Sequence, residues 1–322
     1  MSKPRILVTR RWPQAAEDYV RQHYDATINI GERLTKNQLI AAMREYDGIC
    51  PSGGDKMDAE VLGTSGARVR IVANFGVGFE HIDVAAAKAA GIVATNTPDV
   101  LSDATADIAI LLMLMTSRRA YEGEQQLRDQ TWRGWGARHL LGQSLDGKTL
   151  GLYGMGRIGQ SAARKARAAF GMKIAYHSRN RVAPEIEHEL GATYYPTLEA
   201  LAEVSDVLSL HAPGGPSTHH AVDATLLKRM KPTAILINTA RGTLVDEAAL
   251  VEALKARTIW AAGLDVFEKE PEVHPGLLDL PNVALLPHLG SATVETRVAM
   301  GMRAAHNLDA FFAGKAPQDR IA

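Results

Sequence analysis

The feature that most constrains the fold of this chain is a short apolar run that leads directly into a glycine-rich turn. Residues Thr149–Tyr153 form the run, and residues 154–159 read GMGRIG. A helical pattern follows over 160–170, and another apolar run begins at Lys173. A strand before the glycines, and a helix and a strand after them, are the context that the dinucleotide-binding fingerprint requires. The sequence therefore predicts a dinucleotide-binding βαβ unit, with a turn that holds no ligand as the alternative.

Short apolar runs alternate with longer helical patterns along the whole chain. Strands are predicted at residues 5–9, 26–30, 48–50, 71–73, 92–95, 149–153, 173–177, 207–211, 234–238, 261–266 and 283–286. The helical patterns include a long one from Ser102 to about Glu122 and a last one over 292–313. Such alternation is typical of parallel sheets covered by helices. We expect an α/β fold with two doubly wound, Rossmann-like domains, whose ligands bind beyond the carboxyl ends of the strands.

The composition excludes several classes of protein. Lys plus Arg and Asp plus Glu both total 36, so no general charge attracts nucleic acid or an anionic membrane. The most apolar stretch, 108–115, is far shorter than the roughly 18 residues of a membrane span, and the first residues do not resemble a signal peptide. Cys50 is the single cysteine, which fits a reducing compartment. We expect a cytoplasmic protein that binds neither nucleic acid nor membranes.

The glycine turn has the residues that a dinucleotide site needs. Gly154 permits the tight turn, Gly156 lets the backbone approach a pyrophosphate, and Gly159 lets the helix pack on the strand. The N-terminus of the helix then offers unpaired N–H groups to the phosphates. We expect the cofactor to contact the whole turn: Gly154, Met155, Gly156, Arg157, Ile158 and Gly159.

The segment after the next strand favours NADPH over NADH, which is the weaker alternative. An NAD site needs an acidic residue about 20 positions after the glycines, to hold the ribose 2′-hydroxyl. No Asp or Glu occurs from 160 to 184. Ser178 and Arg179 stand there instead, with Arg181 as a further candidate, and a guanidinium binds phosphate through its planar fork. The alternative is that these arginines only belong to an exposed turn.

Three strand ends in the second half of the chain carry polar groups suited to chemistry at a carbonyl. Hydride addition to a keto carbon leaves an oxyanion, and histidine is the natural proton donor near neutral pH. A carboxylate would stabilise the imidazolium, and an arginine would anchor a substrate carboxylate. Arg241 and His288 follow two of these strands as the candidate arginine and histidine, and Glu268 and Glu270 follow the remaining strand as candidate carboxylates. Taken singly, His288 and Glu270 also fit a core histidine and a turn charge.

The order of these motifs resembles the D-isomer-specific 2-hydroxyacid dehydrogenase family over essentially the whole chain. The resemblance rests on residues 74–78, 154–159, 238–242, 263–271 and 287–293. It implies that Arg241 binds substrate, that His288 is the acid/base and that Glu270 pairs with it. It also implies contacts of Asp265 and Thr105 with the cofactor, and of Ser52 and the Val77 and Gly78 backbone with the substrate.

The resemblance also implies a domain organisation and a partner. The final helix would return to the first domain. Residues 1–101 and 290–322 would then form a flavodoxin-like substrate-binding domain, and residues 102–289 the dinucleotide-binding domain, with an active-site cleft between them. A homodimer is implied. The loop containing Trp132, Trp135 and Arg138 either packs within its own subunit or, as the resemblance implies, reaches the site of a partner subunit.

Residues 96–101 and the pair Ser178–Arg179 resemble the branch of glyoxylate/hydroxypyruvate reductases and 2-ketogluconate reductases. Departures at Asp107, where Glu is frequent, and at residues 52–54 lie on the substrate side. We expect an enzyme that transfers a hydride from NADPH to a small 2-keto acid such as glyoxylate or hydroxypyruvate, giving the D-2-hydroxy acid. Alternatives are a 2-ketogluconate reductase, another D-2-hydroxyacid dehydrogenase and, from a different class, a nicotinamide-sensing corepressor.

Three further histidines belong to a residue type that often binds metal ions, but their spacing does not support a metal site. His211 follows a predicted strand, and His219 and His220 are adjacent. No cysteine or carboxylate stands at a zinc-ligand spacing from them. We therefore expect no metal ion.

Overall fold

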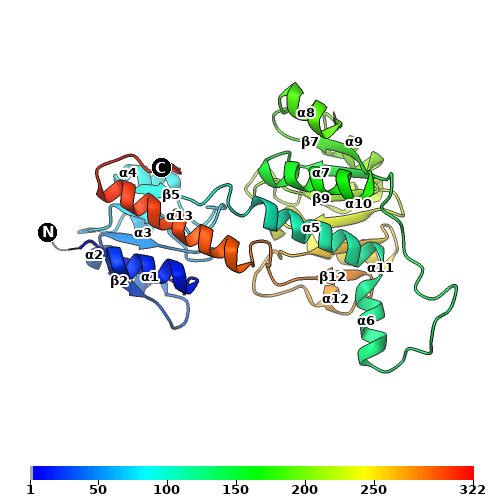
Figure 1. The fold of residues 1–322 in the computed structure, drawn as a ribbon, viewed down its shortest axis with the longest axis horizontal. Coiled ribbons are helices and arrows are strands. Elements are labelled where there is room, and N and C mark those ends of the chain that lie inside the picture. Colours follow the sequence, from blue (N-terminus) through cyan, green and yellow to red (C-terminus); the bar gives the residue numbers. More distant parts are fainter. Residues whose placement is uncertain (1–2) are drawn as a thin grey trace. The chain divides into compact units, whose positions relative to one another are not determined.

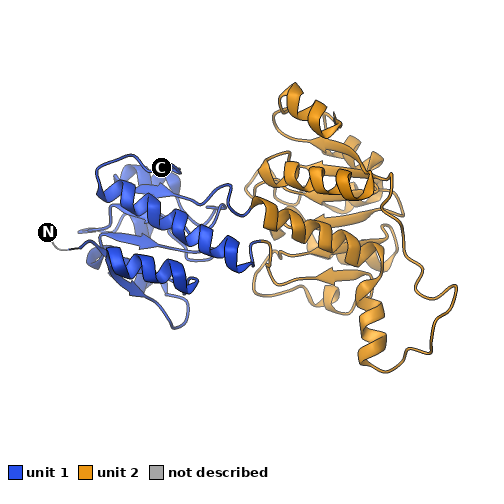
Figure 2. Ribbon diagram, viewed as in Figure 1, with its two compact units in different colours: residues 1–101, 291–322 blue, residues 102–290 orange. Residues whose placement is uncertain are grey.

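The computed structural model describes residues 3–322, which belong to two compact units (Figures 1 and 2). Unit 1 comprises the chain up to Leu101 together with Ser291–Ala322, and unit 2 comprises Ser102–Gly290. The boundary between unit 2 and the final segment of unit 1 lies one residue later than the sequence predicted. Gly290 remains with unit 2 because its amide, like that of Leu289, donates a hydrogen bond to the carboxylate of Asp265.

Unit 1 contains a five-stranded parallel sheet in the order β2-β1-β3-β4-β5, which is the flavodoxin-like order. Its strands are β1 (Arg5–Val8), β2 (Asp25–Ile28), β3 (Gly48–Cys50), β4 (Ile71–Ala73) and β5 (Val93–Thr95). Its helices are α1 (Gln14–His23), α2 (Lys36–Glu45), α3 (Ala59–Leu62), α4 (Val84–Ala89) and α13 (Val294–Phe312).

The two faces of this sheet carry separate hydrophobic cores. Successive side chains of a strand point to opposite faces. Ile6 and Val8 of β1 accordingly join the core under α1 and α13, and Leu7 joins the core under α2, α3 and α4. Helices α1 and α13 lie side by side (Figure 1), and Tyr24, the C-cap residue of α1, donates a 2.6 Å hydrogen bond to Asp309 of α13. The last helix of the chain is thus part of the unit 1 core.

Unit 2 contains a seven-stranded parallel sheet in the order β12-β11-β10-β9-β6-β7-β8. Read along the chain, this is the Rossmann order with one further strand at its end. The strands are β6 (Thr149–Tyr153), β7 (Lys173–His177), β8 (Ala192–Tyr194), β9 (Val207–Leu210), β10 (Ile235–Asn238), β11 (Ala261–Leu264) and β12 (Val283–Leu285). The helices are α5 (Ser102–Ser117), α6 (Ala120–Arg128), α7 (Arg157–Phe170), α8 (Pro184–Leu190), α9 (Leu198–Val204), α10 (Ala224–Arg229), α11 (Glu247–Lys255) and α12 (Pro275–Leu278).

The prediction of one long helix from Ser102 to about Glu122 is wrong. Helix α5 ends at Ser117 and α6 begins at Ala120, because Arg119 adopts a left-handed backbone conformation with a φ of +54°. The Arg119 guanidinium binds Glu122 through two hydrogen bonds of 2.8 and 2.7 Å, which fixes the first turn of α6. In Figure 1, α6 and the loop that follows it extend away from the sheet of unit 2.

The other predicted elements lie within a few residues of the observed ones, except that β8 was not predicted. This short edge strand is only partly buried, so it lacks the apolar run that marks the central strands. Within residues 3–322, none of the helices combines the length and the apolar character that crossing a bilayer would require.

Candidate active site

The glycine turn leaves the carboxyl end of β6 and enters α7 as the sequence predicts. Gly154 has a φ of +101°, and a Cβ atom there would lie 2.7 Å from the backbone nitrogen of Ala212. A Cβ on Gly159 would lie 2.3 Å from the carbonyl oxygen of Gly154. Gly156 differs, because no atom lies within 4 Å of the position that its Cβ would take. The first and third glycines therefore permit close packing, whereas the second leaves space for a ligand.

The start of α7 is suited to an anion. Gly156 is the N-cap residue, and no side chain caps the helix, so the N–H groups of the first turn are available to a ligand. Met155 N donates a 2.7 Å hydrogen bond to Ser178 Oγ, which joins the turn to the end of β7. The residues present fit the pyrophosphate and ribose of a dinucleotide.

The three residues expected near a 2′-phosphate are arranged differently from one another. Ser178 is half-buried against the glycine turn, and Arg179 is exposed and forms no side-chain hydrogen bond or ion pair within residues 3–322. Arg181 is bound by Glu187 through two 2.7 Å hydrogen bonds and lies over the ring of Tyr194. Arg179 is thus available to a phosphate, whereas Arg181 is held by a carboxylate of the protein.

The loops after β10 and β11 are packed tightly together. Asn238 Nδ2 donates to the carbonyl oxygen of Arg241 at 2.9 Å and thereby fixes the loop after β10. A Cβ on Gly242 would lie 1.9 Å from the carbonyl carbon of Phe267, so only glycine allows this approach. The glycine places Arg241 next to the loop that carries Glu270.

Glu270 and His288 form a direct pair at this edge of the sheet. His288 Nδ1 lies 2.8 Å from Glu270 Oε2, and Phe267 N donates to Glu270 Oε1 at 3.1 Å. Burial by itself would raise the pKa of Glu270. The hydrogen bond and charge of His288, the Phe267 amide and the charge of Arg241 together hold that pKa below its ordinary value. The three predicted residues Arg241, Glu270 and His288 therefore lie close enough to interact.

The backbone of His288 is also unusual. Its φ of +55° lies in the left-handed region, which non-glycine residues rarely adopt outside strained or functional positions. His288 N donates to the carbonyl oxygen of Asp265 at 2.9 Å, which holds the residue in this conformation. Its side chain is 53% exposed, so one edge of the imidazole faces Glu270 and the other remains accessible to a ligand.

Asp265 and Thr105, the other two residues expected near the cofactor, lie together in the interior of unit 2. The Asp265 carboxylate accepts hydrogen bonds from the amides of Leu289 at 2.6 Å and Gly290 at 2.8 Å. A Cβ on Gly290 would lie 3.3 Å from Thr105 Cγ2. Burial raises the pKa of Asp265, although the two amides act in the opposite direction. The Asp265 carboxylate therefore fixes the backbone directly after the candidate proton donor, His288.

The residues expected to bind substrate through their backbone lie in unit 1, at the carboxyl ends of its strands. Asn74 Nδ2 donates to the carbonyl oxygens of Gly76 at 3.0 Å and Gly78 at 2.8 Å, and Asn96 Nδ2 donates to that of Val77 at 2.8 Å. These two asparagines hold the turn, and sequence reasoning assigned neither a role. Their position directly after β4 and β5 was the available signal.

Ser52 lies on the loop after β3, which bridges to Phe75 in the neighbouring turn. The Ser52 amide donates to Asp55 Oδ2 at 3.0 Å, and its hydroxyl lies 3.3 Å from the same oxygen. The buried carboxylate of Asp55 therefore fixes the conformation of this loop. This supporting role was not predicted from the sequence.

The adjacent histidines His219 and His220 acquire a carboxylate neighbour in the fold. His220 Nε2 lies 2.9 Å from Glu268 Oε1, and ligating atoms of the three side chains lie within 4.8 Å of one another. His211 is separate from them, and its Nε2 lies 2.9 Å from Ser209 Oγ. Burial lowers the pKa of His211 to about 4, so this ring is neutral beneath the glycine turn.

Unit 2 is a Rossmann sheet with a glycine turn at one strand end. An arginine, a glutamate and a histidine lie at neighbouring strand ends. This combination defines a dinucleotide-dependent dehydrogenase. The profile described as "D-isomer specific 2-hydroxyacid dehydrogenase, NAD binding domain" matches residues 110–290. The chain belongs to the D-isomer-specific 2-hydroxyacid dehydrogenase family.

Individual relatives are similar over nearly their whole length. A glyoxylate reductase of Aeropyrum pernix is 45% identical over 329 residues, which cover 100% of this chain and 96% of that protein. The structure of an NADPH-dependent glyoxylate/hydroxypyruvate reductase from Sinorhizobium meliloti, in complex with NADP and malonate, matches with a TM-score of 0.89 and 44% identity, covering 100% of this chain and 97% of that one. A family member from Polaromonas has a TM-score of 0.93 and 38% identity, with 99% and 100% covered.

Proposed function

We propose that this enzyme is an NADPH-preferring reductase of small 2-keto acids, which reduces glyoxylate to the achiral glycolate and hydroxypyruvate to the D-2-hydroxy acid. The observation that carries the proposal is the Glu270–His288 pair beside Arg241 at the edge of the sheet that also holds the glycine turn. The similarity to glyoxylate reductases supports the choice of substrate class.

Each of the three side chains has a distinct role in this proposal. The guanidinium of Arg241 binds the substrate carboxylate and orients the adjacent carbonyl, as the planar fork of arginine favours. His288 Nε2, the ring nitrogen that does not face Glu270, donates a proton to the substrate oxygen as negative charge develops there. Glu270 fixes the ring orientation through Nδ1 and stabilises the positive charge of the imidazolium. NADPH, when bound, supplies the hydride that adds to C2.

The cofactor site is proposed on residues of unit 2. The amides at the start of α7 bind the pyrophosphate, across the open space at Gly156. Ser178 and Arg179 bind the 2′-phosphate, since Arg179 is available and no carboxylate occupies the position that would repel it. Asp265 and Thr105 contact the nicotinamide portion.

The substrate side is proposed on unit 1. The amides of Val77 and Gly78, in the turn held by Asn74, bind the substrate carboxylate, and Ser52 contacts the remainder of the substrate. Residues 1–101 and 290–322 would thus act as the substrate-binding domain, and residues 102–289 as the dinucleotide-binding domain.

A substrate panel with both cofactors tests the proposal directly. Initial rates would be measured with glyoxylate, hydroxypyruvate, 2-ketogluconate and 3-phosphohydroxypyruvate, each with NADPH and with NADH. We expect the highest kcat/KM for glyoxylate or hydroxypyruvate with NADPH. A preference for NADH would contradict the cofactor assignment, and binding of NADPH without turnover of any substrate would favour a sensing protein instead.

We further propose that the enzyme is a homodimer whose interface includes α6 and the loop after it. Large apolar side chains are exposed there, including Leu127 (62%), Trp135 (87%) and Leu141 (60%), and such exposure is unusual for a surface that faces only water. Light scattering during size exclusion should give twice the mass of the chain, and Trp135→Glu together with Leu127→Glu should give a monomer. A monomeric, fully active wild-type enzyme would contradict this.

A further inference from the structure

Two adjacent histidines and a glutamate form a cluster on unit 2 that the proposed reaction does not use. Ligating atoms of His219, His220 and Glu268 lie within 4.8 Å of one another, and within residues 3–322 no other group of three or more His, Cys, Asp or Glu side chains comes together in this way. The histidines lie on the loop after β9, and Glu268 lies on the loop after β11. His220 and Glu268 are 48 positions apart, so spacing along the chain did not reveal the cluster.

The donor atoms of the cluster are close to the spacing of metal ligands. His220 Nε2 lies 2.9 Å from Glu268 Oε1, and the rings of His219 and His220 are stacked with their centroids 3.9 Å apart. The ligand atoms of a tetrahedral zinc ion, each about 2.0–2.2 Å from the metal, lie about 3.4 Å from one another. Small rotations of the side chains would therefore bring one nitrogen of each histidine and one carboxylate oxygen around a single ion.

The backbone holds both sides of the cluster in place. His220 N donates to the carbonyl oxygen of Thr243 at 2.8 Å, and Glu268 N donates to Oε1 of the buried Glu247 at 2.9 Å. Ligands that the fold already positions lose little conformational entropy when they bind an ion.

The cluster is open to solvent, so an ion can reach it. The side chains of His220 and Glu268 are 32% and 25% exposed, and His219 is exposed. Water can therefore complete the coordination of the ion, as it does in zinc sites that have three protein ligands.

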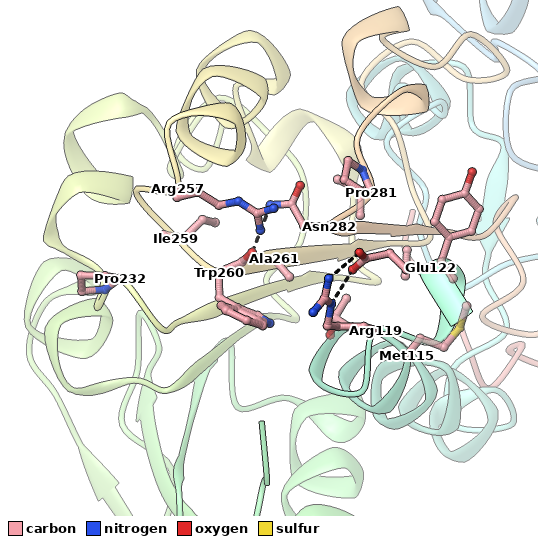
Figure 3. A pocket seen from close by; sticks show the side chains of 14 residues that line it. Met115, Arg119, Glu122, Pro232, Arg257, Ile259, Trp260, Ala261, Pro281 and Asn282 are labelled. Atoms are coloured by element: carbon pink, nitrogen blue, oxygen red, sulfur yellow. Dashed lines mark hydrogen bonds and ion pairs between the residues drawn. The ribbon is translucent and has the colours of Figure 1, made fainter. Parts of the chain in front are cut away.

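The pocket of unit 2 that Figure 3 shows offers no such set of donors. It has a volume of about 300 Å³, and Glu122 is the one His, Cys, Asp or Glu side chain among the described residues that line it. Arg119 already binds this carboxylate through hydrogen bonds of 2.8 and 2.7 Å, which Figure 3 marks with dashed lines. A divalent cation would therefore find its ligands at the histidine cluster rather than in this pocket.

We propose that His219, His220 and Glu268 form a binding site for a divalent transition-metal ion such as Zn²⁺, separate from the candidate active site. Two imidazole nitrogens and a carboxylate oxygen suit zinc and its neighbours, whereas Mg²⁺ and Ca²⁺ prefer oxygen ligands. The ion would join the loop after β9 to the loop after β11 and so stabilise the folded state. The proposal does not depend on which substrate or cofactor the enzyme uses.

The test uses Zn²⁺ alone, with the full-length chain free of any histidine tag. Calorimetry would measure the affinity and the stoichiometry, and thermal unfolding would be followed with and without Zn²⁺. We expect one Zn²⁺ to bind per chain and to raise the Tm, because an ion that binds the folded state stabilises it. Millimolar Mg²⁺ should not displace it.

Three substitutions remove one ligand each. Glu268→Gln removes the charge but keeps an oxygen near His220, and His220→Asn suits the φ of +49° at that position. His219→Gln replaces an exposed side chain and so tests the third ligand without disturbing the core. Each should weaken Zn²⁺ binding at least about tenfold, because even the loss of an outer partner of a metal ligand costs about 10- to 100-fold.

His188→Gln is the matched control. His188 is an exposed histidine of α8 outside the cluster, so its substitution should leave Zn²⁺ binding unchanged. His288→Gln should also bind Zn²⁺ like the wild type. The proposal would be overturned if the wild type bound no Zn²⁺, or if Glu268→Gln and His220→Asn bound it as tightly as the wild type. Loss of binding in His288→Gln would also overturn it, because the ion would then lie at the Glu270–His288 pair.

Discussion

Unit 1 and unit 2 are both doubly wound parallel sheets, but they present different chemistry at the carboxyl ends of their strands. In unit 2 these ends carry the ionisable side chains of Arg241, Glu270 and His288. In unit 1 the corresponding ends carry a turn of small residues, and the side chain of Asn74 holds the backbone in place. The same architecture thus offers charged side chains in one unit and oriented backbone groups in the other.

This difference determines how each unit should respond to substitution. A proton donor or a charged anchor is lost when its side chain is replaced, whereas a backbone amide remains after the side chain beside it is changed. We therefore expect substitutions at the strand ends of unit 2 to affect turnover strongly, and those of exposed side chains in unit 1 to affect it weakly.

The largest effect is expected for His288→Gln. Loss of the general acid should lower kcat with glyoxylate by roughly 100-fold or more, because proton transfer to the developing oxyanion contributes that much. Steady-state kinetics would measure kcat, and fluorescence titration would show whether NADPH still binds with wild-type affinity. A variant with normal kcat would contradict the role of His288 and the contrast between the units.

Glu270→Gln should have a smaller overall effect than His288→Gln. It should also change how the stability of the protein depends on pH. The pKa of Glu270 is held below its ordinary value of 4.5, so the folded protein binds fewer protons at this site than the unfolded chain. The stabilisation that results is present above pH 4.5 and is lost as the pH falls through the lowered pKa. The wild type should therefore have a higher Tm than Glu270→Gln at pH 7, and the gap should narrow by pH 4. A gap that widened in acid would show that the pKa is shifted upwards instead.

Arg179→Ala should weaken NADPH binding by about 10- to 100-fold, the range expected for loss of a hydrogen bond to a charged group. NADH lacks the 2′-phosphate, so its KM should change little. Arg181→Ala serves as the matched control, since Glu187 already holds that guanidinium. Equal losses for the two cofactors would indicate that Arg179 does not contact the 2′-phosphate.

The smallest effect is expected in unit 1, for Ser52→Ala. The hydrogen bond from the Ser52 amide to Asp55 remains in Ser52→Ala, because its donor is a backbone N–H group. We expect kcat/KM for glyoxylate to fall by no more than about tenfold, in line with the loss of one neutral hydrogen bond. A loss as large as that of His288→Gln would remove the contrast between the two units.

Much of the fold could be predicted because the central strands of both sheets are continuous apolar runs. The predicted bounds of β3, β4, β6 and β7 coincide with the observed ones. The break at Arg119 could not be predicted, because nothing in the local residue types requires its left-handed conformation. The edge strand β8 was not predicted, because it is too short and too exposed to show the apolar run of a central strand.

Some residues of the candidate site could likewise be predicted from the sequence, and others could not. Arg241 and His288 could be named as candidates because each follows a strand and suits carbonyl chemistry, and Glu270 could be named through the resemblance to the family. The supporting residues Asn74 and Asn96 could not, because their role depends on hydrogen bonds to turn carbonyls that only the folded backbone brings near.

In the proposed reaction, this enzyme transfers a hydride from NADPH to C2 of a 2-keto acid. The most direct test uses NADPH that carries deuterium at the transferable position of nicotinamide C4, with glyoxylate as the acceptor and mass spectrometry of the product. We expect the glycolate formed to contain one deuterium at C2, in an amount equal to the NADPH oxidised. Glycolate without deuterium, or no glycolate while NADPH remains bound, would contradict it.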